Sequence, residues 1–299
     1  MLILSYNNIP APAALPGGKG PHKLARPARR EIHDMTQDDR ITITKKDGVA
    51  VLTFNRPEVL NAFSPGMGKY MARCLQDLND DPDVRVLVFT GAGKGFCSGK
   101  DLKGSNDLAN PAPRSPYRMF NFHEHNIGSI RSFAKPTIAA VNGVAVGAGL
   151  GVAVACDLRI ASTQARFSAI FSRRGVPAQD AVGAFLPQII GLPKALEMMY
   201  TARMVQADEA LEMGLVGEVV EPERLMDRAL EVAALIASGP PLALAMIKQI
   251  VYRSLGRSMD DQLALQALGT YINVQNAPGD IREAGAAFRE KRAPRFRGE

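Results

Sequence analysis

A helix that begins among glycines can present bare backbone N–H groups to a ligand, and the sequence predicts one such helix. The stretch from Thr137 to Cys156, TIAAVNGVAVGAGLGVAVAC, holds no charged residue. Its β-branched start favours a buried strand, Asn142-Gly143 a break, and Gly147 to Asp157 a helix of small residues. The positive end of that helix dipole would favour an anion or a developing negative charge. Ala148 is therefore a candidate oxyanion-binding residue.

A second glycine-rich loop, Gly91 to Leu102, follows a predicted strand. It has neither the Gly-Lys-Ser/Thr of a phosphate-binding loop nor the spacing and helix register of a dinucleotide fingerprint. Cys97 in this loop could be proposed as a nucleophile. No paired histidine is apparent, however, and buried cysteine is usually unreactive, which disfavours nucleophilic catalysis.

Acid–base candidates gather in a predicted helix from Tyr117 to Phe133, which carries His123, Glu124 and His125. A partly solvated helix face is the simpler interpretation of this trio. An acid–base role is the alternative.

The elements that would position these residues alternate between strands and helices. Ile41–Thr44 and Val49–Phe54, joined by Asp47-Gly48, predict a β-hairpin. Ser64 is expected to cap a helix that runs to about Asp80, and residues 84–90 to form a buried strand parallel to the hairpin. Further along, we expect strands at 157–162, 165–170 and 215–220, a turn at 172–177, and helices at 180–190 and 207–213.

The C-terminal part is expected to be helical and to assemble with other copies. One helix, Pro222–Ser238, carries an apolar stripe, and another begins after Pro240-Pro241. Met259, Leu263, Ala267 and Tyr271 stripe the next helix. Because the helices at 222–238 and 258–275 have more apolar surface than one subunit would cover, we expect a trimer or hexamer.

Composition and charge narrow the class of protein. With 299 residues and 46% hydrophobic content, the chain can bury a substantial core. Three unevenly spaced cysteines give neither a disulfide nor a zinc pattern and favour a cytoplasmic location. Of the net charge of +6, residues 1–34 carry +3, so the remainder suits an anionic small molecule better than a nucleic acid.

Two segments have compositions that bear on targeting or membrane insertion. Residues 1–34 are rich in Pro, Ala, Gly and Arg and are expected to be disordered, with a transit peptide, a misassigned start or residues foreign to the native protein as alternatives. Residues 137–156 are long enough for a membrane span, but Asn142 and four glycines argue against one. No membrane partner is expected.

Three motifs, in order, resemble the crotonase (enoyl-CoA hydratase/isomerase) superfamily. They are Asn55-Arg56-Pro57 through Asn61-Ala62, the loop Gly-Phe-Cys-Ser-Gly-Lys-Asp-Leu, and Lys135-Pro136 through Asn142-Gly143 to Ala155-Cys156-Asp157. The resemblance covers residues 40–298. It implies an α/β fold, a spiral of β-β-α turns at 35–221, followed by a helical trimerisation region at 222–299, often paired into hexamers.

The resemblance also implies an acyl-CoA substrate and no cofactor or metal beyond the CoA of the substrate itself. The thioester oxygen would receive two backbone N–H groups, which by motif are those of Ser98 and Ala148. Such donors can stabilise an enolate by several kcal/mol. The residues implied for CoA binding are Val59, Leu60, Gly99, Lys100, Asp101, Leu102 and Lys291.

The chain departs from the family pattern at its acids. Two glutamates position water in hydratases, and the matching residues here are Gly151 and Phe171, neither of which can transfer a proton. Some isomerases place an acid in a later turn, where ungapped alignment puts Gln179. A one-residue bulge would bring Asp180 into register, with burial then raising its pKa. The alternative role for Asp180 is to cap the following helix.

Several reactions therefore stay open. An enoyl-CoA isomerase or an atypical hydratase is expected, with Asp180 carrying the proton and Glu124 as the second choice. A carbon–carbon bond hydrolase or lyase acting on a β-ketoacyl thioester, with the base drawn from His123, Glu124 or His125, is an alternative. A non-catalytic acyl-CoA binding protein is another.

Overall fold

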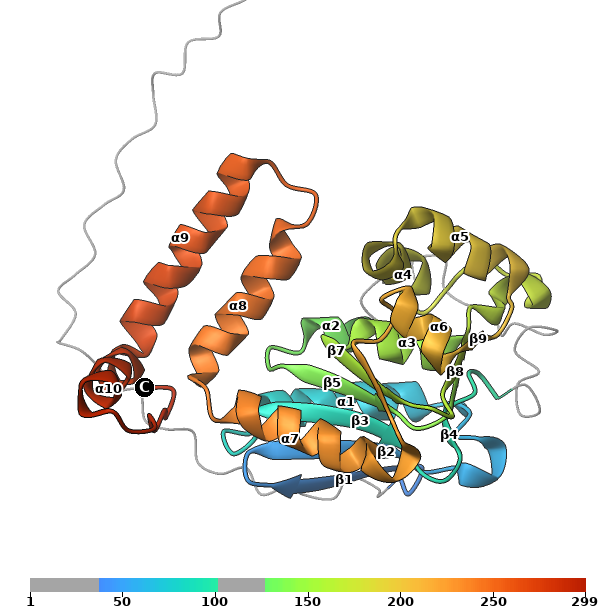
Figure 1. The fold of residues 1–299 in the computed structure, drawn as a ribbon, viewed down its shortest axis with the longest axis horizontal. Coiled ribbons are helices and arrows are strands. Elements are labelled where there is room, and N and C mark those ends of the chain that lie inside the picture. Colours follow the sequence, from blue (N-terminus) through green and yellow to red (C-terminus); the bar gives the residue numbers. More distant parts are fainter. Residues whose placement is uncertain (1–37, 102–126) are drawn as a thin grey trace, which may run out of the picture. The chain divides into compact units, whose positions relative to one another are not determined.

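The computed structural model describes residues 38–101 and 127–299. The expectation of disorder for residues 1–34 lies outside the described residues. Ten strands and ten α-helices follow one another within the described part (Figure 1). The strands are β1 (Ile41–Lys46), β2 (Val49–Phe54), β3 (Val86–Gly91), β4 (Gly95–Cys97), β5 (Thr137–Val141), β6 (Val144–Val146), β7 (Leu158–Ser162), β8 (Arg166–Ser168), β9 (Val205–Gln206) and β10 (Glu218–Val220).

The helices begin with α1 and, after the undescribed segment, continue to the C-terminus. They are α1 (Met67–Asp80), α2 (Gly128–Ser132), α3 (Ala148–Ala155), α4 (Val182–Ile190), α5 (Leu192–Thr201), α6 (Ala207–Glu212), α7 (Leu225–Ala237), α8 (Pro241–Ser254), α9 (Met259–Asn276) and α10 (Pro278–Glu290). The 3₁₀ turns are Pro57–Val59, Ile170–Arg174 and Pro222–Arg224.

The strands form two sheets, and successive turns of the chain contribute to both. The larger has the order β1-β2-β3-β5-β7-β10, and the smaller β4-β6-β8-β9. β3, β5 and β7 pair in parallel in the first sheet, and β4, β6 and β8 follow them in parallel in the second. This is the spiral of β-β-α turns expected of a crotonase fold.

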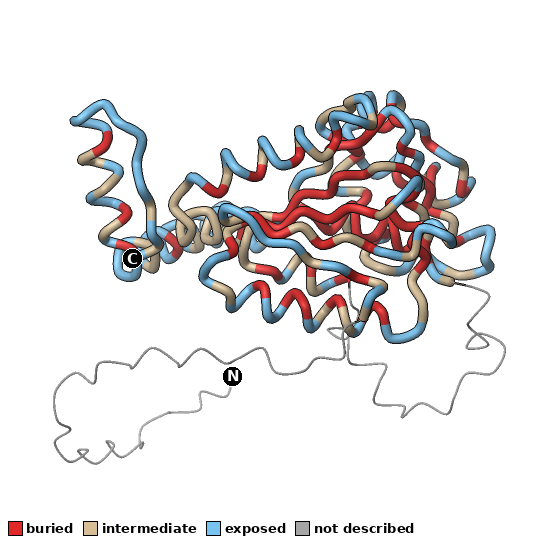
Figure 2. Tube along the Cα trace, turned by 90° about the horizontal axis from the view of Figure 1, so that it is seen from below, coloured by how far each residue is buried: buried red, intermediate tan, exposed pale blue. Residues whose placement is uncertain are grey.

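The large sheet is covered on both faces. Leu87 and Phe89 of β3 face a core shared with α1, α3 and the small sheet. Val86 and Val88, which alternate with them, face a second cluster that includes α7. In Figure 2 the buried residues gather in the central strands. Every residue of α3 is buried as well.

Packing of α7 corrects one expectation. Its stripe of Leu225, Ala229, Val232 and Ile236 lies against the chain's own sheet. The apolar surplus predicted for 222–238 is therefore wrong for this stripe. The stripe of α9 differs, because Met259, Leu263 and Tyr271 are each more than half exposed.

The apolar stretch 137–156 forms β5, β6 and α3 rather than one continuous helix. Within the described ranges, no individual helix has both the length and the apolar character to cross a membrane. The segments Pro222–Ala237 and Pro241–Ser254 meet that test only jointly, with a bend of 104° between them.

Candidate functional site

Two asparagines hold the glycine-rich loop that follows β3. The side-chain amide of Asn61 donates to the carbonyls of Ala92 (2.9 Å) and Gly95 (2.7 Å). Asn142, which follows β5, donates to Gly93 (2.9 Å) and to the same Gly95 carbonyl (3.2 Å). Both asparagines belong to the motifs that carry the family resemblance, and their role here is to fix the loop backbone.

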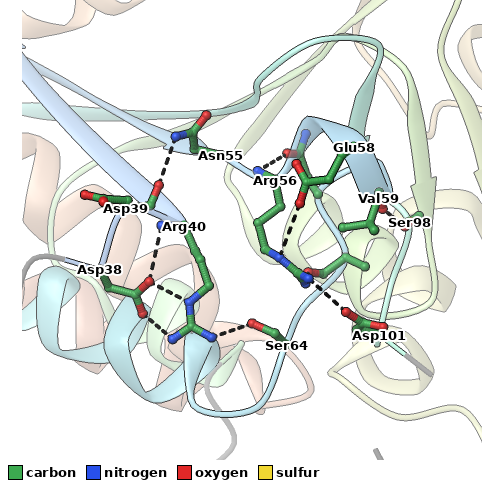
Figure 3. A network of polar contacts seen from close by, with 12 residues as sticks. Asp38, Asp39, Arg40, Asn55, Arg56, Glu58, Val59, Ser64, Ser98 and Asp101 are labelled. Atoms are coloured by element: carbon green, nitrogen blue, oxygen red, sulfur yellow. Dashed lines mark hydrogen bonds and ion pairs between the residues drawn. The ribbon is translucent and has the colours of Figure 1, made fainter. Parts of the chain in front are cut away.

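Arg56 holds the end of this loop against the segment that follows β2 (Figure 3). Its guanidinium donates to the carbonyl of Ala62 (2.6 Å) and to the carboxylate of Asp101 (3.0 Å). Both side chains of the ion pair are mostly buried, at 18% and 15% exposed. The segments 56–63 and 98–101 are thereby joined, although they lie far apart in the sequence.

Ser98 does not fit the role of oxyanion donor. Its backbone N–H donates to the carbonyl of Leu60 at 2.9 Å. Its hydroxyl donates to the carbonyl of Val59 at 3.0 Å. The prediction for Ser98 is corrected on this ground, since an N–H committed within the fold is not available to a substrate. Val59 and Leu60, expected to face CoA, are the residues that hold it.

Lys100 offers the N–H that Ser98 does not. Phe63 and Lys100 form a parallel bridge, in which Phe63 donates to Gly99 O (2.8 Å) and receives from Asp101 N–H (2.9 Å). The intervening N–H of Lys100 therefore points away from Phe63, and it has no backbone partner among the described residues. Which N–H of a loop is open depends on backbone orientation, for which the sequence carries no direct signal.

Ala148 begins α3, as predicted, and its N–H likewise has no backbone partner in the described part of the chain. Gly99 brings the two segments together. A Cβ on Gly99 would lie 2.8 Å from Val146 O and 3.7 Å from Ala148 N, and Gly99 has φ +98°. Only glycine suits this position, because it combines a left-handed backbone with close approach to the start of α3.

The two positions where hydratases carry glutamate contain no acid. Gly151 has no side chain, and Phe171 is buried in the main core. A Cβ added to Gly151 would overlap the carbonyl oxygen of Asp180 and lie 3.1 Å from the Cβ of Asp180. The side chain of Asp180 therefore starts beside the place where one from residue 151 would start. No sequence signal indicated that Gly151 makes room for a residue of another element.

Asp180 is also not the helix cap that its sequence position allowed. The N-cap of α4 is Ala181, and no side chain caps it. Asp180 and Ala181 both have positive φ, at 52° and 65°, an unfavourable conformation for non-glycine residues. Gln179, which the ungapped alignment places at the acidic site, is exposed, whereas Asp180 is partly buried against α3. Strained backbone of this kind is often retained at functional sites.

Cys97 is unsuited to nucleophilic chemistry. Burial raises the pKa of its thiol to about 12, and the charge of Asp180 adds to that rise. At neutral pH the thiol is protonated and enclosed, which agrees with the sequence interpretation.

Four of the predicted residues cannot be placed in the site. Leu102, His123, Glu124 and His125 lie outside the described residues. Lys291 follows α10, which in Figure 1 lies away from β4 and its loop, so the structure does not bring it to the candidates among the described residues.

Comparison with known proteins identifies the family of this chain. Residues 44–299 match the family model described as enoyl-CoA hydratase/isomerase. The chain belongs to this enoyl-CoA hydratase/isomerase family. Its spiral fold and its helical C-terminal region are those that the sequence motifs predicted.

Individual relatives of the family differ in the reactions that they are named for. The 1,2-epoxyphenylacetyl-CoA isomerase of Escherichia coli (strain K12) is 36% identical, over 84% of this chain and 96% of its own length. The (E)-benzylidenesuccinyl-CoA hydratase of Thauera aromatica is 38% identical, over 86% and 99%. A crystal structure of enoyl-CoA hydratase from Mycobacterium smegmatis superposes with a TM-score of 0.76 at 31% identity, covering 86% of this chain and 98% of that one.

Proposed function

We propose that the protein isomerises the double bond of an enoyl-CoA thioester by a proton shift. The family match supports a CoA thioester as substrate. The observation that carries the proposal is the position of Asp180, whose side chain starts beside Gly151 where hydratases present a glutamate. In this proposal a single carboxylate, that of Asp180, transfers the proton on one side of the bound acyl chain.

The oxyanion site in this proposal consists of the N–H groups of Lys100 and Ala148. Both lack a backbone partner in the described residues, and they belong to segments that meet at Gly99. They would hold the thioester oxygen as negative charge develops on it. Two such preorganised donors lower the barrier most when charge appears only in the transition state.

Proton transfer is assigned to Asp180. Its carboxylate takes a proton from the carbon on one side of the double bond system, and the electron pair moves through the conjugated chain to the thioester oxygen. The dienolate then collapses as the protonated Asp180 returns the proton to the other end of the three-carbon unit. No water, oxidant or second acid is consumed.

Hydration is the second candidate, because a benzylidenesuccinyl-CoA hydratase is 38% identical to this chain. A syn addition of water calls for one group to orient water and another to supply a proton. Gly151 and Phe171 can do neither. An atypical hydratase would therefore need an acid from outside these two positions, with Glu124 as the candidate named by the sequence.

The test is incubation of the protein with enoyl-CoA and β-ketoacyl-CoA panels in heavy water, read by mass spectrometry. Deuterium at the α or γ carbon, with an unchanged chain, is the expected result. Net addition of water would favour hydration, chain cleavage would favour a hydrolase, and binding without any change would favour a non-catalytic role.

The assignment of Asp180 is tested by Asp180→Asn, with Gln179→Ala as the matched control in the same turn. Loss of the base is expected to lower kcat by about 10² to 10⁴ with the fold intact. Gln179→Ala should leave turnover within about twofold. Near-normal turnover in Asp180→Asn, with collapse in Glu124→Gln, would move the assignment to Glu124.

The oxyanion site is tested by Ala148→Pro. Proline is accommodated at the first position of a helix, so this change removes the N–H with little cost to α3. We expect a loss of about 10² to 10³ in kcat. Unaltered CoA-ester affinity and turnover would contradict the role of Ala148.

Assembly into trimers, or dimers of trimers, belongs to the same proposal. It is supported by the exposed stripe of α9, which holds Met259, Leu263 and Tyr271. A neighbouring subunit would also give Lys291 a route to the CoA of another chain's site, which it lacks within its own chain.

A further inference from the structure

Arg131 of α2 is held between two aromatic rings. Its guanidinium carbon lies 4.0 Å from the ring centre of Phe185 and 3.9 Å from that of Tyr252. Phe185 belongs to α4 and Tyr252 to α8. A planar cation in van der Waals contact with two rings is attracted by both, and the flat guanidinium suits this arrangement better than an ammonium group would.

The hydrogen bonds of Arg131 add another helix to this contact. One terminal nitrogen donates to the carbonyl of Val154, in the last turn of α3, at 3.1 Å. The buried Nε atom has no partner in the described part of the chain. The two ring contacts therefore determine the position of this guanidinium as much as its hydrogen bond does. The arrangement leaves one buried donor, Nε, without a hydrogen bond, which is unfavourable.

Two of the helices joined by Arg131, α3 and α4, begin at or just after the candidate catalytic groups. α3 begins at Ala148, and α4 begins two residues after Asp180. The N–H of Phe185 donates to the carbonyl of Ala181 at 2.9 Å, so the stacked ring is tied directly to the strained turn. A shift of Phe185 would move the Asp180 turn relative to α3.

Tyr252 is itself fixed by a mostly buried carboxylate just after the end of α3. Its hydroxyl donates to Asp157 at 2.7 Å. Lys248, also on α8 and almost fully buried, pairs with the same carboxylate at 2.9 Å. Asp157 also accepts from the N–H and hydroxyl of Thr137 in β5. α8 is therefore attached to the core at the point where Arg131 is stacked.

We infer that Arg131 is a positioning residue, which sets the Asp180 turn against the oxyanion side of α3 and makes this spacing depend on α8. The inference rests on the proposed function, because it assigns Asp180 the proton transfer. Small errors in such a spacing are costly, since a misplacement of about 1 Å can lower the rate by about 10². Binding of CoA is not expected to change in the same way, because Arg131 lies against α3, α4 and α8 rather than against the segments named for CoA.

The variants Arg131→Met and Tyr252→Leu test this role, with Tyr252→Phe and Arg159→Met as matched controls. Tyr252→Phe keeps the ring and removes the hydroxyl. Arg159 also donates to carbonyls at the end of α3, those of Cys156 (2.7 Å) and Ala153 (3.5 Å), and to Leu215 (2.7 Å), but none of these bonds joins it to α4. It controls for the loss of a buried guanidinium as such.

Arg131→Met and Tyr252→Leu are expected to lower kcat by about 10- to 100-fold while KM changes by less than about twofold. The double variant should lose little more than either single one, because both changes remove the same stacked contact. Tyr252→Phe should stay within about threefold of the parent kcat. Arg159→Met should lower the Tm with kcat retained.

Amide hydrogen exchange supplies a readout that does not depend on activity. Arg131→Met should speed exchange in residues 181–186 more than in β3 or β5, and Arg159→Met should not. Equal losses of kcat in the Arg131 and Arg159 variants, or unchanged exchange and kcat in Arg131→Met, would overturn the inference. If the parent protein turns over no enoyl-CoA but the exchange pattern holds, the proposed function fails while the coupling of α8 to the Asp180 turn stands.

Discussion

α3 and α9 are helices of the same chain, yet their surroundings differ completely. All eight residues of α3 are buried. Of the eighteen residues of α9, Gly269 alone is buried. α3 is enclosed by the chain's own sheets and by α4, so its composition of small residues serves close approach to other backbone. α9 presents apolar side chains, among them Met259, Leu263 and Tyr271, that the described part of the chain leaves exposed.

The difference separates two kinds of constraint. Around α3 an added methyl group would contact backbone atoms, so it would alter the geometry of the candidate site and the activity. On the exposed stripe of α9 the same change meets solvent in a single chain, so it would alter the affinity for another copy.

Tyr271→Glu should have the largest effect, because a charge placed in an interface between copies would be buried without a partner. The association free energy is expected to fall by about 3 kcal/mol or more, which converts the assembly to monomers at micromolar concentration. Light scattering measures this. Tyr200→Glu on α5 is the control, since Tyr200 is comparably exposed (73% against 63%) but lies outside the C-terminal helices. A monomeric parent protein, or equal dissociation in both variants, would contradict the contrast.

Gly151→Ala should have a moderate effect on the other side of the comparison. The added methyl would overlap the carbonyl oxygen of Asp180, a backbone atom that cannot turn away as the end of a side chain could. We expect a loss of about 1 to 3 kcal/mol in the free energy of unfolding, and reduced turnover as the Asp180 turn is displaced. Chemical denaturation measures the first.

The matched control for that change is Gly183→Ala in the first turn of α4. There the added Cβ would meet Ala178 at an ordinary 3.5 Å. Alanine is the better helix former, so this variant should gain about 0.5 to 1 kcal/mol. Two glycine-to-alanine changes close to the same turn are thus expected to have opposite signs. Similar signs would mean that Asp180 does not pack against Gly151 as described.

The smallest effect is expected from alkaline pH on the buried core. Burial raises the pKa of the Cys156 thiol to about 12, above the ordinary value near 9. The stabilisation that comes from a raised pKa is complete below the pKa of the unfolded state. It is lost as the pH rises towards the pKa of the folded state. Between pH 8 and 10, the range measured, this thiol should cost about 1.4 kcal/mol in total, since the loss begins only near pH 9. Urea denaturation of the parent and of Cys156→Ala between pH 8 and 10 should show a steeper decline in the parent, and parallel curves would contradict this.

The sequence predicted the architecture well, because its motifs and apolar periodicities are local signals. The β1–β2 hairpin, β3, β5, α1 and α3 fall close to where they were expected. Short elements were missed. β4 and β6 have three residues each. β4 lies inside the segment interpreted as a glycine-rich loop, and β6 fills the residues between the predicted break and the predicted helix. α5 was not predicted either.

The site was predictable in its composition but not in its geometry. Ala148 and the 98–101 segment were identified from motifs. Whether Ser98 or Lys100 has the open N–H depends on the bridge to Phe63, which is a property of the folded backbone. Ser64 was expected to cap α1, yet Gly66 is the N-cap and the Ser64 hydroxyl accepts from Arg40 instead. The stacking of Arg131 joins three helices, and no local pattern records such a contact.

The shared carbonyl of Gly95 also has a consequence for the order of folding. Its two asparagine partners lie 34 and 47 residues away, one before it in the chain and one after it. Chain segments of this length must be brought together before these hydrogen bonds can form. The glycine-rich loop can therefore take its final form only after β5 has docked beside β3. During synthesis from the N-terminus, the loop would leave the ribosome well before the residue that completes it. The most exactingly shaped part of the chain is therefore expected to be among the last to become ordered.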